Sequence, residues 1–167
     1  FDGRHYLVDS GSGKGARFTV RVPIKRDKRE RLKPRVTIDG DSSDSGPLAL
    51  VVDDDEANCA VMIRMLQKYG FSCDSVHFAS DALDSIRDCD YDVVFMDLHM
   101  PDRTGFDTTT AIRNGELGER KSHIRIVAFT LMRERTVDVG FDELLLKPVT
   151  FRELERVLST LHLMELA

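Results

Sequence analysis

The sequence lacks an apolar run long enough to cross a bilayer, and it has few cysteines. A membrane-spanning helix needs about 20 apolar residues, and no apolar run here approaches that length. The first residues contain no basic stretch followed by an apolar one, so we expect no signal peptide and no membrane contact. The three cysteines, Cys59, Cys73 and Cys89, are odd in number and have no CxxC spacing. They indicate buried thiols in a reducing cytoplasm rather than disulfides or a zinc site.

Charge is distributed unevenly along the 167 residues, which suffice for one well-packed domain and a short additional segment. Residues 1–47 carry 11 Lys and Arg against 7 Asp and Glu, a net charge of +4. Residues 48–167 carry 13 against 22, a net charge of −9. Nucleic-acid-binding domains are usually basic, so we expect no nucleic-acid partner for the acidic part. The basic stretch at residues 25–33 is interrupted by acids and indicates a solvated linker.

Polar residues follow four short apolar segments, at the points where we expect strands to end. They are Asp53 with Asp54, Asp97, Thr130 and Lys147. The carboxyl ends of parallel strands share one edge of a sheet, so these side chains should converge. Carboxylates held together need a cation, and oxygen ligands suit Mg²⁺. With a carboxylate as nucleophile, and with a hydroxyl and an ammonium for phosphoryl oxygens, the set predicts a site that accepts a phosphoryl group on aspartate.

The surroundings of these four positions closely resemble the receiver domain of two-component signalling proteins. The resemblance runs from about Leu48 to His162. Its motifs are Val51-Val52-Asp53-Asp54 with Glu56 and Asn58, Phe95-Met96-Asp97 with Met100-Pro101 and Gly105, Ala128-Phe129-Thr130, and Gly140-Phe141-Asp142 through Leu146-Lys147-Pro148. One such motif is weak, because paired aspartates after a strand are common helix caps. Four in this order, each at a strand end, are a strong signal.

The resemblance implies a role for each residue of the site. Asp97 is the expected phosphoacceptor, which attacks phosphorus to give an acyl phosphate. Asp53 and Asp54, with Asp97 and the backbone carbonyl of His99, would hold Mg²⁺. Thr130 would donate a hydrogen bond to a phosphoryl oxygen, and Lys147 would neutralise its charge. A cis peptide before Pro148 is implied as well, and the His99 side chain is expected to be exposed.

Apolar runs alternate with helical patterns after residue 47, which predicts a doubly wound α/β fold. The resemblance implies a (βα)5 flavodoxin-like receiver fold with a five-stranded parallel sheet of order 2-1-3-4-5. We expect strands at 48–52, 72–77, 92–96, 125–129 and 143–146, and helices at 56–69, at 80–87, after Gly105 and from Phe151. Gly70 should end the first helix.

The N-terminal residues carry a second resemblance. Residues 10–23 contain a glycine pair before a strand that ends in a proline, like the closing segment of a histidine-kinase ATP-binding domain; a glycine turn before an edge strand is the alternative. We therefore divide the chain into an ATP-binding-domain remnant at 1–25, a flexible linker at 26–47 and a receiver domain at 48–167. No histidine lies in a His-Glu-x-x-x-Pro context. The fragment should not be a kinase by itself, although its parent would be a hybrid histidine kinase.

Several functions compete at this stage. The favoured one is a receiver that takes a phosphoryl group from a kinase phosphohistidine, in the same polypeptide, and passes it to a histidine phosphotransfer protein. A Mg²⁺-dependent phosphatase with an aspartyl-phosphate intermediate would need an aspartate where His99 stands. A flavodoxin-like FMN binder would have to place phosphate against an acidic run, and a transcription factor would need an output domain after Ala167. A receiver-only regulatory module also stays open as a function. We expect the fragment to lie in the cytoplasm, and a membrane anchor elsewhere in the parent protein also stays open.

Some residues depart from the family pattern. Leu144 replaces a frequent Tyr or Phe, Leu131 follows Thr130 where a small residue is usual, and Thr104 replaces a frequent acid. None of these changes removes a chemical group of the site. The apolar residues Met62, Ile63 and Met65 exceed what one buried helix face needs, so we expect part of this set to form an exposed patch for a partner.

Overall fold

The computed structural model describes residues 6–9, 17–20, 46–131 and 139–164. Two compact units divide the chain, Phe1–Pro34 and Arg35–Ala167. In the first unit, β1 (Tyr6–Asp9) pairs with β2 (Arg17–Val20) in antiparallel fashion, with Tyr6 opposite Val20. The strand predicted after the glycines is therefore present.

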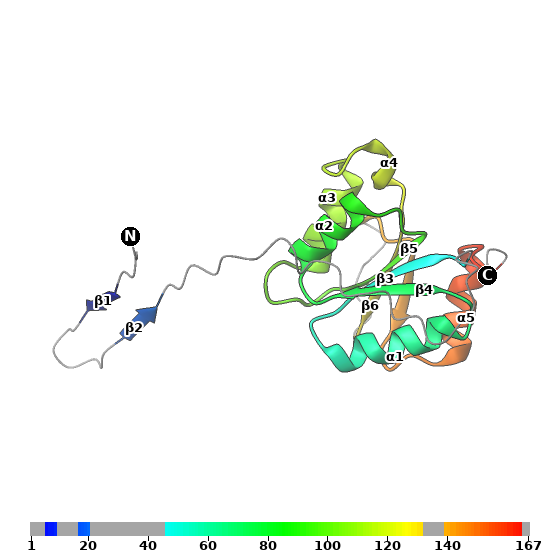
Figure 1. Cartoon of the computed structure of the whole chain (residues 1–167), viewed down its shortest axis with the longest axis horizontal. Coiled ribbons are helices and arrows are strands. Elements are labelled where there is room, and N and C mark those ends of the chain that lie inside the picture. The colour runs from blue at the N-terminus through cyan, green and yellow to red at the C-terminus, as the bar shows by residue number, and fades with distance from the viewer. Residues whose placement is uncertain (1–5, 10–16, 21–45, 132–138, 165–167) are drawn as a thin grey trace. The chain divides into compact units, whose positions relative to one another are not determined.

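The second unit is built on five parallel strands, as Figure 1 shows. They are β3 (Leu48–Val52), β4 (Ser72–Val76), β5 (Val93–Asp97), β6 (Arg125–Thr130) and β7 (Glu143–Leu146). Their order across the sheet is β4-β3-β5-β6-β7. Numbered within this unit alone, that order is 2-1-3-4-5, so the predicted topology is confirmed.

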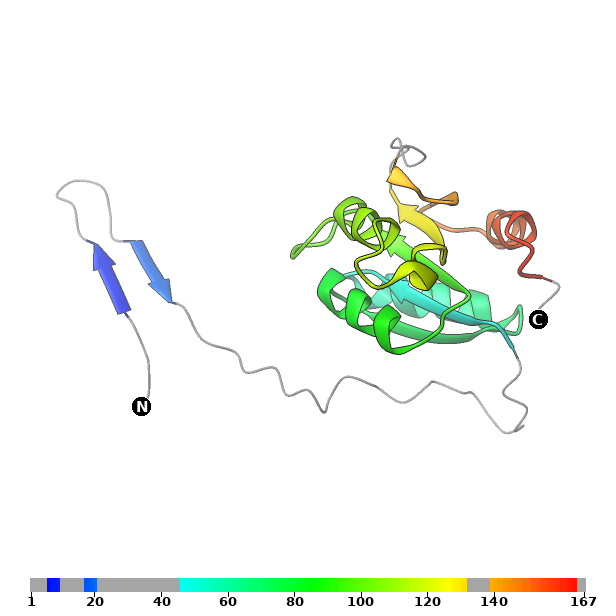
Figure 2. The same cartoon turned by 90° about the horizontal axis from the view of Figure 1, so that it is seen from above.

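Helices cover both faces of the sheet, as Figures 1 and 2 show. They are α1 (Glu56–Gln67), α2 (Ala79–Asp88), α3 (Gly105–Arg113), α4 (Glu119–Ser122) and α5 (Phe151–Thr160). The short α4, which precedes β6, was not predicted. A helix of the (βα)5 fold is expected between β6 and β7, and residues 132–138 of that connection lie outside the described residues.

Two apolar clusters, one on each face, hold the sheet to its helices. Side chains alternate along a strand, so neighbouring residues belong to different clusters. Val51 and Phe95 pack with α1 and α5, whereas Leu50 and Met96 pack with α2 and α3. With both faces covered, the central strand β5 is entirely buried. Asp97, the last residue of β5, is therefore held at the end of a strand that is packed on both faces.

The predicted boundaries agree with the observed ones to within two residues. Gly70 adopts φ +79°, and its N–H donates to the Gln67 carbonyl at 3.1 Å, which ends α1 as expected. The peptide between Lys147 and Pro148 is cis, as predicted. At the start of α5, Thr150 and Glu153 form a reciprocal capping box.

One arginine ties three segments together on the α3 side of the sheet. Arg113, the last residue of α3, donates to the carbonyl oxygens of Ser122, Ile124 and Gly140, each at 2.7 Å. Its fourth contact is with the Asp142 carboxylate at 2.8 Å. The same carboxylate oxygen accepts the N–H of Ile126, at 2.7 Å. A single guanidinium thus fixes the entrance to β6 and the approach to β7.

Three consecutive threonines in α3 have different hydrogen-bonding states. The hydroxyls of Thr108 and Thr110 donate to the carbonyl oxygens of Thr104 and Phe106, four residues earlier. Thr109 is fully buried, and its hydroxyl has no hydrogen-bond partner within the part of the chain that is described. A buried hydroxyl without a partner costs stability.

We expect Thr109→Val to stabilise the protein by about 1 kcal/mol, because it replaces an unpaired hydroxyl with a methyl group of the same shape. Thr108→Val is the matched control, since Thr108 is equally buried but has a partner; it should destabilise. Thermal or urea unfolding of both variants checks this. A loss of stability in Thr109→Val equal to that in Thr108→Val would contradict it.

Candidate functional site

The polar residues predicted from strand ends all lie at one edge of the sheet. Asp53 directly follows β3, Asp97 ends β5, Thr130 ends β6 and Lys147 directly follows β7. Asp97 lies opposite Phe129, so Thr130 is one residue further along β6. Thr130 in turn lies opposite Leu146, the residue before Lys147. The backbone therefore places these four residues at one edge of the sheet, as the sequence predicts.

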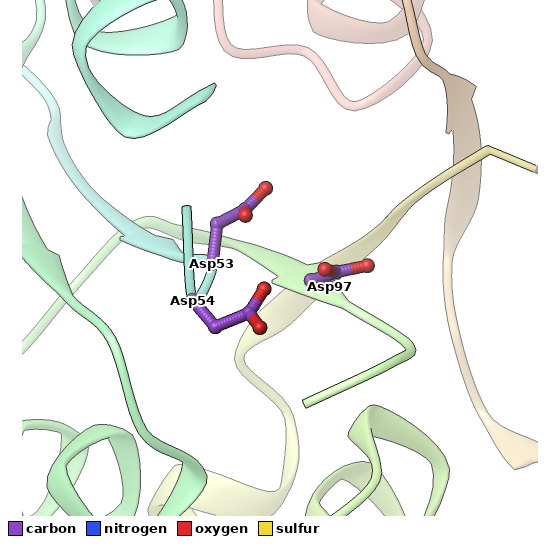
Figure 3. A group of neighbouring side chains, drawn as sticks. All are labelled: Asp53, Asp54 and Asp97. Atoms are coloured by element: carbon purple, nitrogen blue, oxygen red, sulfur yellow. The ribbon is translucent and has the colours of Figure 1, made fainter. Parts of the chain in front are cut away.

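Three carboxylates form a compact cluster at this edge. Asp53, Asp54 and Asp97 each offer an oxygen, and these oxygens lie within 4.8 Å of one another. Figure 3 shows the three side chains, with Asp53 and Asp54 from the segment after β3 and Asp97 from the end of β5. Asp53 and Asp97 are buried, whereas Asp54 is exposed. Such a cluster is accessible from one side and is buried on the other.

Lys147 supplies a positive charge inside this cluster. Its Nζ lies 2.6 Å from Oδ2 of Asp53 and 3.1 Å from Oδ2 of Asp97, and its side chain is only 9% exposed. The backbone N–H of Lys147 donates to the carbonyl of Thr130 at 2.8 Å. The ammonium also lies over the ring of Phe129, 4.4 Å from its centroid. Both ends of the lysine are therefore fixed.

The two oxygens of the Asp53 carboxylate have different partners. Oδ1 accepts the N–H of Asp55 at 3.0 Å and Nδ2 of Asn58 at 3.2 Å. Oδ2 is buried, and the Lys147 ammonium contacts it at 2.6 Å. With the carboxylates of Asp54 and Asp97 close by, this oxygen belongs to an all-oxygen donor set of the kind that Mg²⁺ prefers.

The backbone of Asp53 is fixed by residues that sequence reasoning missed. Nδ1 of His77 lies 2.9 Å from the Asp53 carbonyl oxygen, so it carries the proton and donates. Sγ of Cys59 lies 3.5 Å from the same oxygen. Burial, followed by the charge of Asp53, raises the pKa of the Cys59 thiol to about 12, so the thiol stays protonated and can donate. Only three-dimensional proximity relates His77 to Asp53.

Burial raises the pKa of Asp97 above its ordinary value. The charge of Asp53 raises it further, while the Lys147 ammonium and the backbone N–H of His99 lower it. The His99 contact, 3.4 Å from its N–H to Oδ1 of Asp97, orients the carboxylate. Desolvation raises the pKa of Asp97 more than the Lys147 ammonium lowers it, so the ionised form of Asp97 destabilises the fold.

The remaining predicted residues lie around this cluster. The side chain of His99 is exposed, as expected, and its backbone carbonyl stays a predicted metal ligand. Thr130 is fully buried. Leu131 is 73% exposed, so its side chain is not packed in the core.

The loop after Asp97 packs tightly against its own strand. Gly105, the first residue of α3, donates its N–H to the carbonyl of Leu98 at 3.1 Å. A Cβ atom on Gly105 would lie 2.1 Å from the backbone oxygen of Asp97, which no real contact tolerates. Further along the loop, Asp102 caps α2 by accepting the N–H groups of Ala79 and Ser80 at 3.2 and 3.1 Å. That cap is remote in sequence and was not predicted.

The prediction that Met62, Ile63 and Met65 contribute to an exposed apolar patch on α1 is wrong. Met62 and Met65 are buried against the sheet, and Ile63 is partly buried against the same cluster. The exposed apolar side chain of this helix is Val61, at 56%. The helix is buried over a wider arc than the periodicity suggested, because Ile63 also packs against the apolar cluster to which the buried residues of α5 belong.

The arrangement can perform one kind of chemistry well. A buried carboxylate, Asp97, lies beside the carboxylates of Asp53 and Asp54 and a fixed ammonium. These groups can stabilise negative charge that arrives next to a carboxylate nucleophile. The described residues include no helix that is long and apolar enough to cross a membrane.

Comparison with known proteins supports this reading. The family model described as "Response regulator receiver domain" matches residues 49–159. Hybrid signal transduction histidine kinase L of Dictyostelium discoideum is 33% identical over 118 residues, which is 66% of this chain and 7% of that protein. Sensor histidine kinase GacS of Pseudomonas protegens is 31% identical over 135 residues, 78% of this chain and 14% of that protein. The chain thus spans a small part of these relatives.

A solved structure extends the comparison to three dimensions. It is the receiver domain of sensor histidine kinase PA1611 from Pseudomonas aeruginosa, with a magnesium ion coordinated in its active-site cleft. It is 28% identical, covers 70% of this chain and 98% of its own, and gives a TM-score of 0.63. The similarity covers the five-stranded unit.

Proposed function

Because the chain belongs to the response regulator receiver domain family, we propose that it accepts a phosphoryl group on Asp97, with Mg²⁺, and relays it to a histidine phosphotransfer protein. The observation that carries the proposal is the Lys147 contact to Asp53 and Asp97, because it holds a positive charge beside the one buried carboxylate that ends the central strand. The hybrid kinases among its relatives support a role in two-component signalling.

In the proposed transfer, Asp97 is the nucleophile. One of its carboxylate oxygens attacks the phosphorus of a phosphohistidine, a new O–P bond forms and the P–N bond breaks, leaving the donor histidine with the electron pair. Lys147 then faces an oxygen of the bound phosphoryl group, and the Thr130 hydroxyl donates to another. Asp53 and Asp54, with Asp97 and the His99 carbonyl, would hold Mg²⁺, which supplies charge neutralisation for the phosphoryl oxygens.

A phosphatase remains the competing enzyme class. It would use the same aspartyl phosphate but would need a second acid two residues after the nucleophile. His99 occupies that position, and it is exposed. We therefore favour a receiver, which loses its phosphoryl group slowly by its own hydrolysis. A receiver that regulates without relay to a phosphotransfer protein is the second candidate.

The upstream residues fit a hybrid kinase as the parent protein. We propose residues 1–25 as the end of an ATP-binding domain, residues 26–47 as the linker and residues 48–167 as the receiver. The antiparallel pairing of β1 with β2 is compatible with this division. The donor kinase would then belong to the same polypeptide. The cytoplasmic location stays a prediction.

Beryllofluoride, which mimics a phosphoryl group on aspartate, provides the direct test of the proposed function. We expect beryllofluoride with Mg²⁺ to shift the amide NMR signals of Asp97, Thr130 and Lys147 in the whole chain. Omission of Mg²⁺ should prevent the shifts. Unchanged spectra with both reagents present would rule out a working acceptor site.

Magnesium should stabilise the fold, because it offsets the repulsion between the three carboxylates. Ligand binding to the folded state contributes about 2.7 kcal/mol at 100 times Kd. We expect 10 mM MgCl₂ to raise Tm relative to NaCl of equal ionic strength, and Asp54→Ala to reduce the increase. Asp55→Ala is the control, since Asp55 belongs to the same acidic run but caps α1 instead. It should lower Tm yet keep the Mg²⁺ response; equal responses in both variants would contradict the metal site.

The exposed Leu131 should slow reactions of the phosphorylated site. Hydrolysis needs a water aligned opposite the Asp97 oxygen, and a leucine after Thr130 obstructs it more than an alanine would. We expect Leu131→Ala to shorten the phosphoryl half-life and to speed uptake from acetyl phosphate by about threefold, or roughly 0.6 kcal/mol in the barrier. Val61→Ala removes another exposed apolar side chain, on α1, and should change neither rate. An unchanged half-life with a lower Tm would mean that Leu131 acts by packing.

A further inference from the structure

Lys147 is fixed at both of its ends by the neighbouring residues Phe129 and Thr130. Its N–H donates to the Thr130 carbonyl, and its ammonium lies 4.4 Å from the centroid of the Phe129 ring. The two carboxylates contact the same ammonium at 2.6 and 3.1 Å. The ring is 4% exposed and the lysine side chain 9%, so water is largely excluded from their contact.

We propose that Phe129 is a positioning residue for Lys147, and that its ring face keeps the ammonium beside Asp97 while a phosphoryl group is transferred. The inference rests on the proposed function, because it assigns a role to Phe129 in that reaction. It concerns the electrostatics of the ring and not only its size.

A lysine needs such support more than an arginine would. Its four-carbon stem is flexible and its ammonium is a point charge without a fixed fork of donors. In the metal-free state the two carboxylates hold the ammonium, but a cation at Asp53 would weaken that contact. The ring attracts the ammonium from a direction that does not change when the charges at the site change.

The ring also leaves the hydrogen-bond donors of the lysine available. The negative face of an aromatic ring attracts a cation through its quadrupole, and this attraction grows when both groups are desolvated. An acceptor such as a glutamine side chain would occupy an N–H group that a phosphoryl oxygen needs. An aliphatic residue would pack equally well without attracting the charge. A buried phenylalanine meets both requirements.

Fluorinated phenylalanines separate the electrostatic role from packing. Fluorine withdraws electron density from the ring face with little change in size, so replacement of Phe129 by mono-, di- and trifluorophenylalanine weakens the attraction stepwise. Phe71 is the matched control, because it is equally exposed, at 4%, and belongs to the same apolar cluster. The phosphorylation rate of the whole chain with acetyl phosphate and Mg²⁺ is measured for both series.

We expect the rate to fall with each fluorine at Phe129, to about one-third to one-tenth for the trifluoro ring, which corresponds to roughly 0.6–1.4 kcal/mol. The Phe71 series should stay flat. A flat series at Phe129, or equal slopes at both positions, would overturn the inference.

A second measurement needs no phosphorylation. In the metal-free protein, the ring current of Phe129 should move the NMR signals of the Lys147 Cε protons upfield, and Phe129→Leu should abolish that shift. Signals at ordinary positions in the wild type would overturn the inference by themselves. If the wild type instead shows the shift but never becomes phosphorylated at Asp97, the contact is upheld and the proposed function fails.

Discussion

Replacement of Asp97 by asparagine should abolish phosphoryl uptake and leave the fold intact. The amide has the shape of the carboxylate but cannot attack phosphorus to form a stable acyl phosphate. Incubation of the whole chain with a labelled phosphodonor and Mg²⁺, followed by mapping of the label, provides the measurement. We expect wild-type label on Asp97 and none on Asp97→Asn. Label on another residue in that variant would show that the phosphoacceptor is assigned wrongly.

The same substitution should raise the stability of the metal-free protein at neutral pH. Burial raises the pKa of Asp97 in the folded state, so the ionised group costs stability once the pH exceeds that pKa. Asparagine is neutral at every pH and avoids this cost. We expect its Tm to exceed that of the wild type by a few degrees at pH 7. The difference should shrink as the pH falls through the raised pKa toward the ordinary one, because Asp97 then becomes neutral in the fold.

Loss of the Arg113 guanidinium should have the largest effect on stability. Arg113→Met keeps the apolar stem but removes one donor from each of three carbonyl oxygens and from the Asp142 carboxylate. Arg113 is 21% exposed, so water restores part of the loss. We expect a cost of about 2–4 kcal/mol, measured by urea unfolding at pH 7.

Two further substitutions show whether the geometry of the guanidinium matters. Arg156→Met is the control, since Arg156 is 54% exposed and bonds the Glu143 carboxylate and the Leu144 carbonyl. It should cost no more than about 1 kcal/mol. Arg113→Lys should recover little, because an ammonium cannot reach carbonyls in three segments from one position. If Arg113→Met and Arg156→Met proved equally stable, Arg113 would not be the tie between β6 and β7.

The parts of the fold and site that depend on the local pattern of apolar and polar residues were predictable from the sequence. Strands end where apolar runs end, and parallel strands bring those ends to one edge, so Asp53, Asp97, Thr130 and Lys147 could be grouped before any coordinates were known. The turn at Gly70, which ends α1, also depends on residues close in sequence. Local signals of this kind require no knowledge of packing.

Contacts between distant residues were not predictable in the same way. His77 meets the Asp53 carbonyl across 24 positions, and Asp102 caps a helix that begins 23 positions earlier. Neither pair shares a motif or a periodicity. The exposed patch predicted on α1 failed for a related reason: a single helix pattern cannot show how much of its flank the rest of the fold covers. The Phe129 ring beneath Lys147 belongs with these contacts.

Gly105 has a consequence for how this protein can evolve. Every other amino acid carries a Cβ atom, which would lie 2.1 Å from the Asp97 carbonyl oxygen. That obstacle is backbone and cannot rotate away as a side chain could. A substitution at Gly105 is therefore neutral only if α3 and β5 move apart, and such a shift would displace Asp97, the proposed phosphoacceptor. The start of α3 and the position of Asp97 are therefore coupled, so a substitution at Gly105 is expected to change both of them together.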